Sequence, residues 1–274
     1  MRLLLALAAC MIPALAWAAE PVPVEIPNGD AKLRALLYKP DGDGPFATVV
    51  GLHGCEGLLN AQGAPSARYR DWAQRLNTAG FAVVLPDSYA SRGIAGSQCA
   101  VRGRAVRPDR ERVGDVQAAR GWLHEQAWVA GDRIALLGWS NGGIAALWAV
   151  RPRLAPKDGK ADFRSAAALY PGCRRLLNAA WSTRVPTLVL VGAADDQIRP
   201  ADCQQMVAGA KGRSARAVIH VYQGAYHDFD HPSRRMQTRS GYAFSADGSG
   251  RVHTGTHPSA RADALRRVPE WLKR

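Results

Sequence analysis

One segment of the sequence has residue types and a spacing that suit nucleophilic catalysis. Gly138-Trp139-Ser140-Asn141-Gly142 matches the G-x-S-x-G pattern and lies between an apolar run typical of a buried strand and a stretch typical of a helix. A serine in such a tight turn faces the free N–H groups at the start of the helix, which stabilise negative charge on oxygen. A glycine-rich turn without chemistry would have the same letters, but the flanking strand and helix favour Ser140 as a nucleophile.

A serine hydroxyl is a weak nucleophile and needs a base together with an acid that orients the base. Both residue types occur later in the chain, each after an apolar run that is typical of a strand. Asp195 follows the run 187–191, and His227 follows the run 218–222. The order Ser, Asp, His along the chain is one that catalytic triads use when each member follows a strand of an α/β sheet. We therefore predict Ser140 as the nucleophile, Asp195 as the acid and His227 as the base.

Two alternatives stay open at this point. Asp196 is adjacent to Asp195 and could be the acid instead. His227, Asp228 and His231 could together bind a metal ion. The triad accounts for more residues with fewer assumptions, so we expect no metal and no organic cofactor.

The same chemistry needs two backbone N–H groups that bind the oxyanion. One is expected from Asn141, the residue after the nucleophile. The second is expected from the loop after the run 47–52, which reads His53-Gly54-Cys55-Glu56-Gly57. We assign the second donor to Cys55 and expect His53 to hold the loop.

The elements that must position these residues alternate along the chain. Short apolar runs alternate with longer amphipathic stretches, which is typical of an α/β fold with a mostly parallel sheet. Asn28-Gly29-Asp30 predicts an antiparallel hairpin at the start. We expect strands at 22–26, 33–38, 47–52, 81–85, 133–139, 165–170, 187–191 and 218–222, helices at 66–78, 109–126, 142–150, 201–210 and 259–273, and loops at 151–160 and 240–255.

The first residues predict a secretory signal peptide at 1–18. Arg2 precedes an apolar run, and Ala16-Trp17-Ala18 has small residues where cleavage requires them, near Ala18. The run is shorter than the about 20 residues that span a bilayer, so no transmembrane segment is expected after removal of the signal. A lipoprotein signal ending at Cys10 would leave a hydrophobic region of only about seven residues, which disfavours it. We therefore expect one domain, 19–274, that is periplasmic or secreted.

Four cysteines remain in the mature chain, an even number for an oxidising compartment. Spacing alone allows three connectivities. We hypothesise that Cys55 pairs with Cys99 and Cys173 with Cys203, because in each pair both residues lie in loops at the same end of the sheet. The close C-x-x-C spacing of zinc sites does not occur.

The net charge of +13, or +12 without Arg2, predicts anionic neighbours. The arginines are dispersed and accompany no nucleic-acid-binding motif, so we expect no nucleic-acid partner and a weak electrostatic association with an anionic envelope surface. The segment 91–112 could be a lid that attracts anionic substrates or a solvated loop. It contains Arg92, Arg102, Arg104, Arg107, Arg110 and Arg112.

From about Leu33 to Leu272 the chain resembles the dienelactone hydrolase family. The segments that carry the resemblance are Leu52-His53-Gly54-Cys55-Glu56-Gly57, Pro86-Asp87-Ser88-Tyr89, Gly138-Trp139-Ser140-Asn141-Gly142-Gly143 and Gly224-Ala225-Tyr226-His227-Asp228-Phe229. The resemblance implies an α/β-hydrolase fold with helices on both faces of the sheet, and it maps the family's triad onto Ser140, Asp195 and His227.

The chain departs from the best-known members of this family in two ways. Those members have a cysteine nucleophile, where this chain has Ser140, and they hold a substrate carboxylate with two arginines. Arg92 stands at the first arginine position and His231 at the second. The resemblance with these departures implies a serine hydrolase that cleaves a small ester or lactone through an acyl-enzyme. An acyltransferase or peptidase with the same triad, or a non-catalytic envelope-binding protein on this scaffold, are the alternatives.

Overall fold

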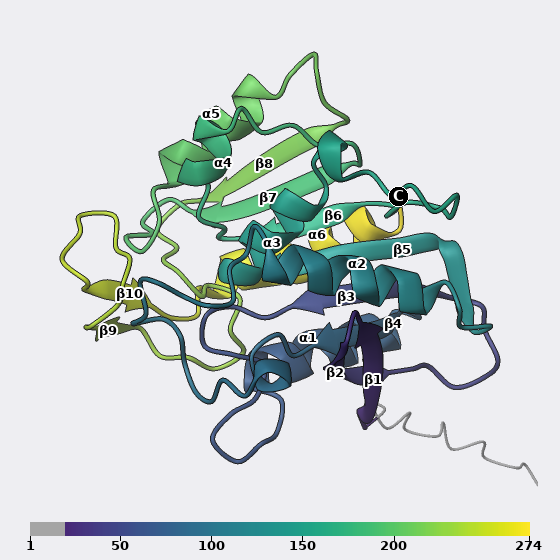
Figure 1. Cartoon of the computed structure of the whole chain (residues 1–274). Helices are drawn as coiled ribbons and strands as arrows, with labels where there is room; N and C mark the ends of the chain where they lie inside the picture. Colours follow the sequence, from purple (N-terminus) through teal and green to yellow (C-terminus); the bar gives the residue numbers. More distant parts are fainter. Residues whose placement is uncertain (1–19) are drawn as a thin grey trace, which may run out of the picture.

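The computed structural model describes residues 20–274, so the expected signal peptide and Cys10 lie outside the described residues. Its centre is an eight-stranded sheet in the order β1-β2-β4-β3-β5-β6-β7-β8 (Figure 1). The strands are β1 (Val22–Asn28), β2 (Ala31–Tyr38), β3 (Phe46–Leu52), β4 (Ala82–Pro86), β5 (Val129–Trp139), β6 (Ala166–Leu169), β7 (Thr187–Gly192) and β8 (Ala217–Tyr222).

The directions of the strands confirm the expected sheet. β1 and β2 form an antiparallel hairpin, and β2 is also antiparallel to β4. All the neighbours from β4 through β8 are parallel. The hairpin turns at Gly29, whose φ of 62° suits glycine, with Asn28 paired to Ala31. The carboxyl ends of the parallel strands therefore lie at one edge, where ligands of α/β sheets bind.

Helices cover both faces of the sheet, as expected (Figure 1). Alternate side chains of β3 show the two faces: Val50 belongs to one buried apolar cluster and Val49 to the other. The first cluster contains residues of α2, α3, α4 and α5, and the second contains residues of α1 and α6. The helices are α1 (Ala67–Thr78), α2 (Glu111–Leu123), α3 (Asn141–Ala149), α4 (Arg174–Asn178), α5 (Pro200–Gly209) and α6 (Pro258–Leu272), with short 3₁₀ turns at Ala90–Arg92 and Pro152–Leu154.

Several elements differ from the sequence expectations, among them the short helix α4, which lies where no helix was expected. β5 begins at Val129, four residues early, because Asp132 and Arg133 interrupt its apolar run while its first residue still pairs with Phe46. The segment 240–255 was expected to be a loop, but its end contains β10 (Val252–Thr254), which pairs with β9 (Gln237–Arg239). These strands have three residues each, too few for an alternating pattern to be visible in the sequence.

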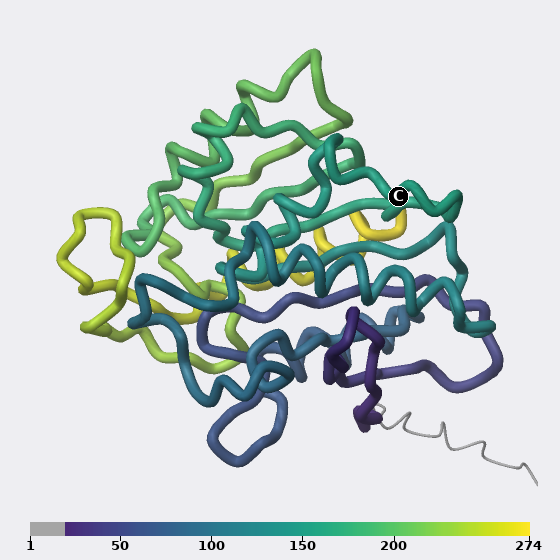
Figure 2. Tube along the Cα trace, in the orientation of Figure 1, coloured from purple at the N-terminus to yellow at the C-terminus, as the bar shows by residue number. Residues whose placement is uncertain are grey.

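The β9–β10 hairpin lies beside the carboxyl edge of the main sheet, at the left of the trace in Figure 2, and its long connection extends outward. Val252 is fully buried, and Thr254 forms a bridge with His227. The Gly255 N–H also donates to the His227 carbonyl at 3.1 Å. The hairpin thus fixes the backbone of the loop that follows β8.

Candidate active site

Ser140 occupies a strained turn between β5 and α3. Its φ of 49° and ψ of −114° lie outside the regions that non-glycine residues ordinarily adopt. The Ser140 N–H donates to the Leu169 carbonyl at 2.9 Å, which ties the turn to β6. Strain of this kind is kept only where the surroundings enforce it, as they do at functional sites.

The two glycines of the motif allow this turn to pack tightly. A Cβ on Gly138 would lie 2.4 Å from the Gly142 carbonyl oxygen, and one on Gly142 would lie 1.9 Å from the Leu52 carbonyl oxygen. Neither distance leaves room for a methyl group. Gly138 is therefore required by close packing within the turn itself, and Gly142 by contact with the end of β3.

The structure brings Ser140, His227 and Asp195 into one hydrogen-bonded chain. His227 Nε2 lies 3.1 Å from Ser140 Oγ, and His227 Nδ1 lies 2.7 Å from Asp195 Oδ2. The other oxygen of Asp195 accepts the N–H groups of Gln197 at 2.9 Å and Ile198 at 3.0 Å. Asp195 is thus fixed by its own turn and points one oxygen at the imidazole.

His227 is almost fully buried, with 2% of its surface exposed. Burial lowers the pKa of His227, but the charge and hydrogen bond of Asp195 raise it by more, so this pKa lies above its ordinary value. Asp195 therefore favours the imidazolium that forms when His227 accepts a proton.

The neighbouring carboxylate, Asp196, has a different partner. Its Oδ2 lies 2.6 Å from His253 Nδ1, and its Oδ1 accepts the His253 N–H at 2.8 Å. Asp196 therefore connects the loop after β7 to β10 and does not contact His227. The geometry favours Asp195 over Asp196 as the acid, a choice that the sequence left open.

The buried carboxylate of Asp230, which the sequence analysis did not identify, connects residues that contact the site. Asp230 is fully buried and accepts hydrogen bonds from Trp72 Nε1 at 2.7 Å, Trp139 Nε1 at 2.9 Å and Tyr170 Oη at 2.5 Å. Trp139 precedes the serine, and the ring of Tyr170 packs against His227 with centroids 4.4 Å apart. Only the fold shows this connection, because the donors lie on α1, β5 and the end of β6.

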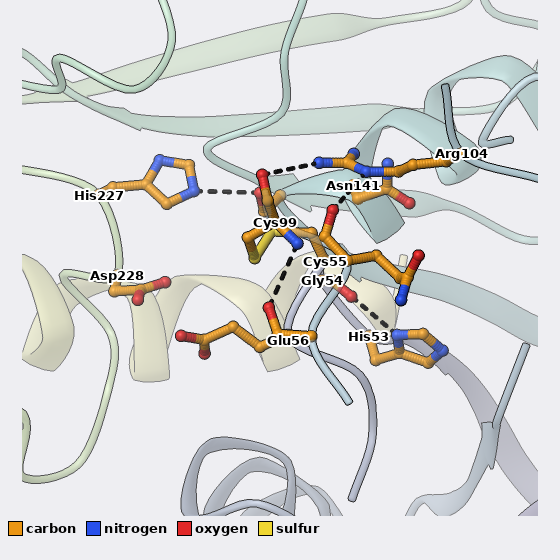
Figure 3. Close-up of a disulfide and its surroundings, with 12 residues drawn as sticks. His53, Gly54, Cys55, Glu56, Cys99, Arg104, Asn141, His227 and Asp228 are labelled. Atoms are coloured by element: carbon orange, nitrogen blue, oxygen red, sulfur yellow. Dashed lines mark hydrogen bonds between the residues drawn. A yellow bond between two sulfur atoms is a disulfide. The ribbon is translucent and has the colours of Figure 1, made fainter. Parts of the chain in front are cut away.

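The expected oxyanion loop lies directly against the serine turn (Figure 3). A Cβ on Gly54 would be 3.5 Å from Ser140 Cβ, so the backbone of this loop is in contact with the turn that contains Ser140. Among residues 20–274, neither the Cys55 N–H nor the Asn141 N–H donates to a protein acceptor. The absence of a protein acceptor is what the assignment of these two N–H groups to an oxyanion hole requires.

His53 holds this loop in place. His53 Nδ1 lies 2.8 Å from the Gly54 carbonyl oxygen, and the Ser88 N–H donates to His53 Nε2 at 3.2 Å. Complete burial, together with the charge of Arg112, holds the pKa of His53 well below its ordinary value. The ring is therefore neutral, with one nitrogen donating and the other accepting.

A solvent-open pocket of 230 Å³ lies over Ser140 and His227. Charged side chains in and beside its wall form ion pairs with one another. Arg68 Nη2 lies 2.5 Å from Asp228 Oδ1, and Arg234 pairs with both Asp228 and Glu56. No single pattern in the sequence marks this cluster, because its members come from three separate segments: the loop after β3, α1 and the connection between β8 and β9. The lining residues are Gly54, Cys55, Glu56, Arg68, Cys99, Ser140, Gln197, His227, Asp228 and Tyr242.

Neither residue expected to bind a substrate carboxylate lines this pocket. The Arg92 guanidinium pairs with Asp115 at 2.7 Å and donates to the Ser88 carbonyl at 2.8 Å, so its charge is used within the scaffold. His231 accepts the Ser233 N–H at 3.2 Å. Burial and the charges of Arg68 and Arg234 lower the pKa of His231 to about 4, so it is uncharged at neutral pH. The structure therefore does not bring Arg92 and His231 together at this pocket, and their role in binding a substrate carboxylate stays a prediction.

The cysteines pair as hypothesised. Cys55 is bonded to Cys99 and Cys173 to Cys203, with Cα atoms 5.0 Å apart in each pair. Disulfides persist in extracellular or periplasmic proteins. Within residues 20–274, no helix has the length and apolar character needed to cross a membrane.

Comparison with solved structures identifies the fold. The dienelactone hydrolase of Anabaena variabilis matches with a TM-score of 0.62 and 18% identity, covering 93% of this chain and 97% of that chain. The dienelactone hydrolase-like promiscuous phosphotriesterase P91 from metagenomic libraries matches with a TM-score of 0.69 and 19% identity, covering 93% and 98%. Esterase 2 of Thermogutta terrifontis matches with a TM-score of 0.64 and 17% identity, covering 95% and 97%.

No curated protein matches the chain. A model of the dienelactone hydrolase family matches residues 33–274, which is most of the sequence. The chain therefore belongs to the dienelactone hydrolase family and is a hydrolase that acts on ester bonds.

Proposed function

We propose that this protein is an exported serine hydrolase that cleaves small carboxylic esters or lactones through an acyl-enzyme on Ser140. The observation that carries the proposal is the chain of contacts from Ser140 Oγ through His227 to Asp195, with distances of 3.1 Å and 2.7 Å. Ser140, the first residue in this series of contacts, lines a pocket that is open to a substrate.

In the first half of the reaction, His227 Nε2 removes the Ser140 proton as the oxygen attacks the ester carbonyl. The carbonyl oxygen becomes an oxyanion and accepts hydrogen bonds from the Cys55 and Asn141 N–H groups. Asp195 stabilises the imidazolium. His227 then gives its proton to the leaving alkoxide, the carbon–oxygen bond breaks, and the acyl group remains on Ser140.

In the second half, water replaces the departed alcohol. His227 removes a proton from the water as its oxygen attacks the acyl carbon, and the same N–H groups bind the new oxyanion. The proton passes from His227 to Ser140 Oγ as the carbon–oxygen bond to the serine breaks. The products are a carboxylic acid and the free enzyme. In a lactone, alcohol and acid remain in one molecule.

The pocket supports a small and uncharged substrate. The pocket is open to solvent beside Ser140 and His227 and encloses little space for a large ligand. Glu56, Arg68 and Asp228 in its wall are already compensated by ion pairs, so none of these charges requires a charged substrate as a partner. Short-chain esters are therefore the first substrates to test.

Location outside the cytoplasm is part of the proposal. Two disulfides, Cys55–Cys99 and Cys173–Cys203, are stable in oxidising compartments. The signal-peptide pattern at residues 1–18 supports the same location.

The test compares the mature protein with a Ser140→Ala variant in hydrolysis of p-nitrophenyl acetate and butyrate. We expect the variant to lose nearly all activity, and paraoxon to label Ser140 in the wild type only. Labelling with paraoxon is supported by the solved structure of Thermogutta terrifontis esterase 2 phosphorylated by paraoxon. Equal activity in both proteins would overturn the proposal. Product analysis with added alcohols or amines distinguishes hydrolysis from acyl transfer.

A further inference from the structure

The two residues whose N–H groups are assigned to the oxyanion hole, Cys55 and Asn141, both contact the same segment, residues 98–112, which we call the brace. On the first side, Cys99 is bonded to Cys55, the residue that carries one of the two N–H groups (Figure 3). The N–H of Gln98 donates to the Cys55 carbonyl at 2.8 Å. Cys55 is thus held through both its side chain and its carbonyl.

The brace is itself held by internal hydrogen bonds and by contacts with Ala243 and Phe244. Arg104 Nε donates to the Gln98 carbonyl at 2.8 Å, and its guanidinium lies 5.2 Å from the ring centre of Phe244. The Ala243 N–H donates to the Cys99 carbonyl at 2.9 Å. Arg104 therefore connects the brace to the segment that contains Phe244.

On the second side, Arg112 holds the residue that carries the other N–H group. Arg112 Nη1 donates to Asn141 Oδ1 at 2.7 Å. The Arg112 side chain is fully buried, and within residues 20–274 its Nε and Nη2 atoms have no hydrogen-bond partner. Burying an incompletely paired cation is costly, so its retention beside Asn141 points to a role there.

We propose that the brace positions the oxyanion hole, with Cys99 setting the Cys55 N–H and Arg112 setting the Asn141 N–H, so that both are positioning residues for ester hydrolysis. The inference rests on the proposed function. An oxyanion hole acts only when its donors are fixed at the place where charge develops, and loss of one donor lowers kcat by about 10²–10³-fold.

The first test breaks the disulfide at the brace without altering the Cys55 peptide. We expect Cys99→Ser to lower kcat by about 10–100-fold and to leave KM within about twofold, because a displaced donor affects the transition state more than the bound ester. The matched control is the double variant Cys173→Ser/Cys203→Ser, which removes the other buried disulfide away from the pocket. Both proteins lose thermal stability, and only the first loses kcat. Equal kcat in the two variants would refute the proposal.

A second test uses Arg112 and a transition-state analogue, so the proposal does not depend on one variant. A boronic acid forms a tetrahedral adduct with a serine nucleophile and occupies the oxyanion hole. We expect Arg112→Met to weaken boronic acid binding by the same factor as it lowers kcat/KM, and Arg112→Lys to recover part of both. Unchanged boronic acid affinity in Arg112→Met and Cys99→Ser would overturn the inference.

The outcomes also separate this inference from the proposed function. If the wild type is active and Ser140→Ala is not, while the Cys99 and Arg112 variants retain full kcat, the hydrolase proposal stands and the brace proposal fails. If wild type and Ser140→Ala have equal activity, both fail.

Discussion

Replacing Asp195 by asparagine tests which carboxylate serves the histidine. The amide oxygen of the new side chain would still accept the N–H groups of Gln197 and Ile198, so its NH2 group would face His227 Nδ1, where the carboxylate oxygen lies 2.7 Å away. An NH2 group at that place requires Nδ1 to accept. The ring proton would then be on Nε2 and point at Ser140, where it prevents proton removal.

We expect Asp195→Asn to lower kcat/KM for p-nitrophenyl acetate by about 10⁴-fold, as in other triads whose histidine is held in the wrong tautomer. That loss corresponds to about 5 kcal/mol of transition-state stabilisation. Folding should be preserved, because the substitution is isosteric and keeps the turn bonds. Circular dichroism and the unfolding midpoint are measured beside the rates.

The matched control is Asp196→Asn. This residue is adjacent in sequence, but its carboxylate contacts His253, so its substitution should change kcat/KM by less than about tenfold. If Asp196→Asn loses activity by the larger factor and Asp195→Asn does not, the assignment of the acid is refuted.

Two further predictions follow from the site. His227 must be neutral to accept a proton, and its pKa lies above the ordinary value of 6.5. We therefore expect kcat/KM for a neutral ester, measured from about pH 5 to 9, to increase with pH and to reach half its plateau above pH 6.5. A midpoint below pH 6.5 would contradict the role of Asp195. Gly142→Ala should unfold the protein or lower its free energy of unfolding by at least about 3 kcal/mol in a urea titration, because the added Cβ would overlap the Leu52 carbonyl. The control is Gly114→Ala in α2, where the added Cβ meets nothing within 4 Å and should stabilise the protein by about 0.5–1 kcal/mol. Equal effects of the two substitutions would refute the packing argument.

Much of the fold was predictable because its signals are local. Parallel strands that are buried on both sides read as continuous apolar runs, and the turn at Gly29 marks the hairpin. The β9–β10 hairpin was not predicted, because three-residue strands carry no period and their pairing depends on contacts with the loop of His227. The early start of β5 was missed for a related reason, since polar residues interrupt its apolar pattern.

The candidate site divides in the same way. Ser140 and His227 were identifiable because each follows a strand within a short motif, and parallel strands bring such loops to one edge of the sheet. Arg92 and His231, expected to bind a substrate carboxylate, do not line the pocket, because a position relative to a motif does not determine where a long side chain finds its partner. Arg92 pairs with Asp115, which lies on α2.

The sequence by itself determined most strands of the main sheet and the longer helices, their order, the tight turn at Ser140 and the residue types that the chemistry needs, because these depend on neighbours along the chain. The tertiary structure decided which of two adjacent aspartates contacts the imidazole, that Asp230 connects Trp139 to Tyr170, and that Arg112 reaches Asn141. Each of these contacts joins residues far apart in the chain. Side-chain partners at that range are set by packing of the whole core, so only the folded structure specifies them.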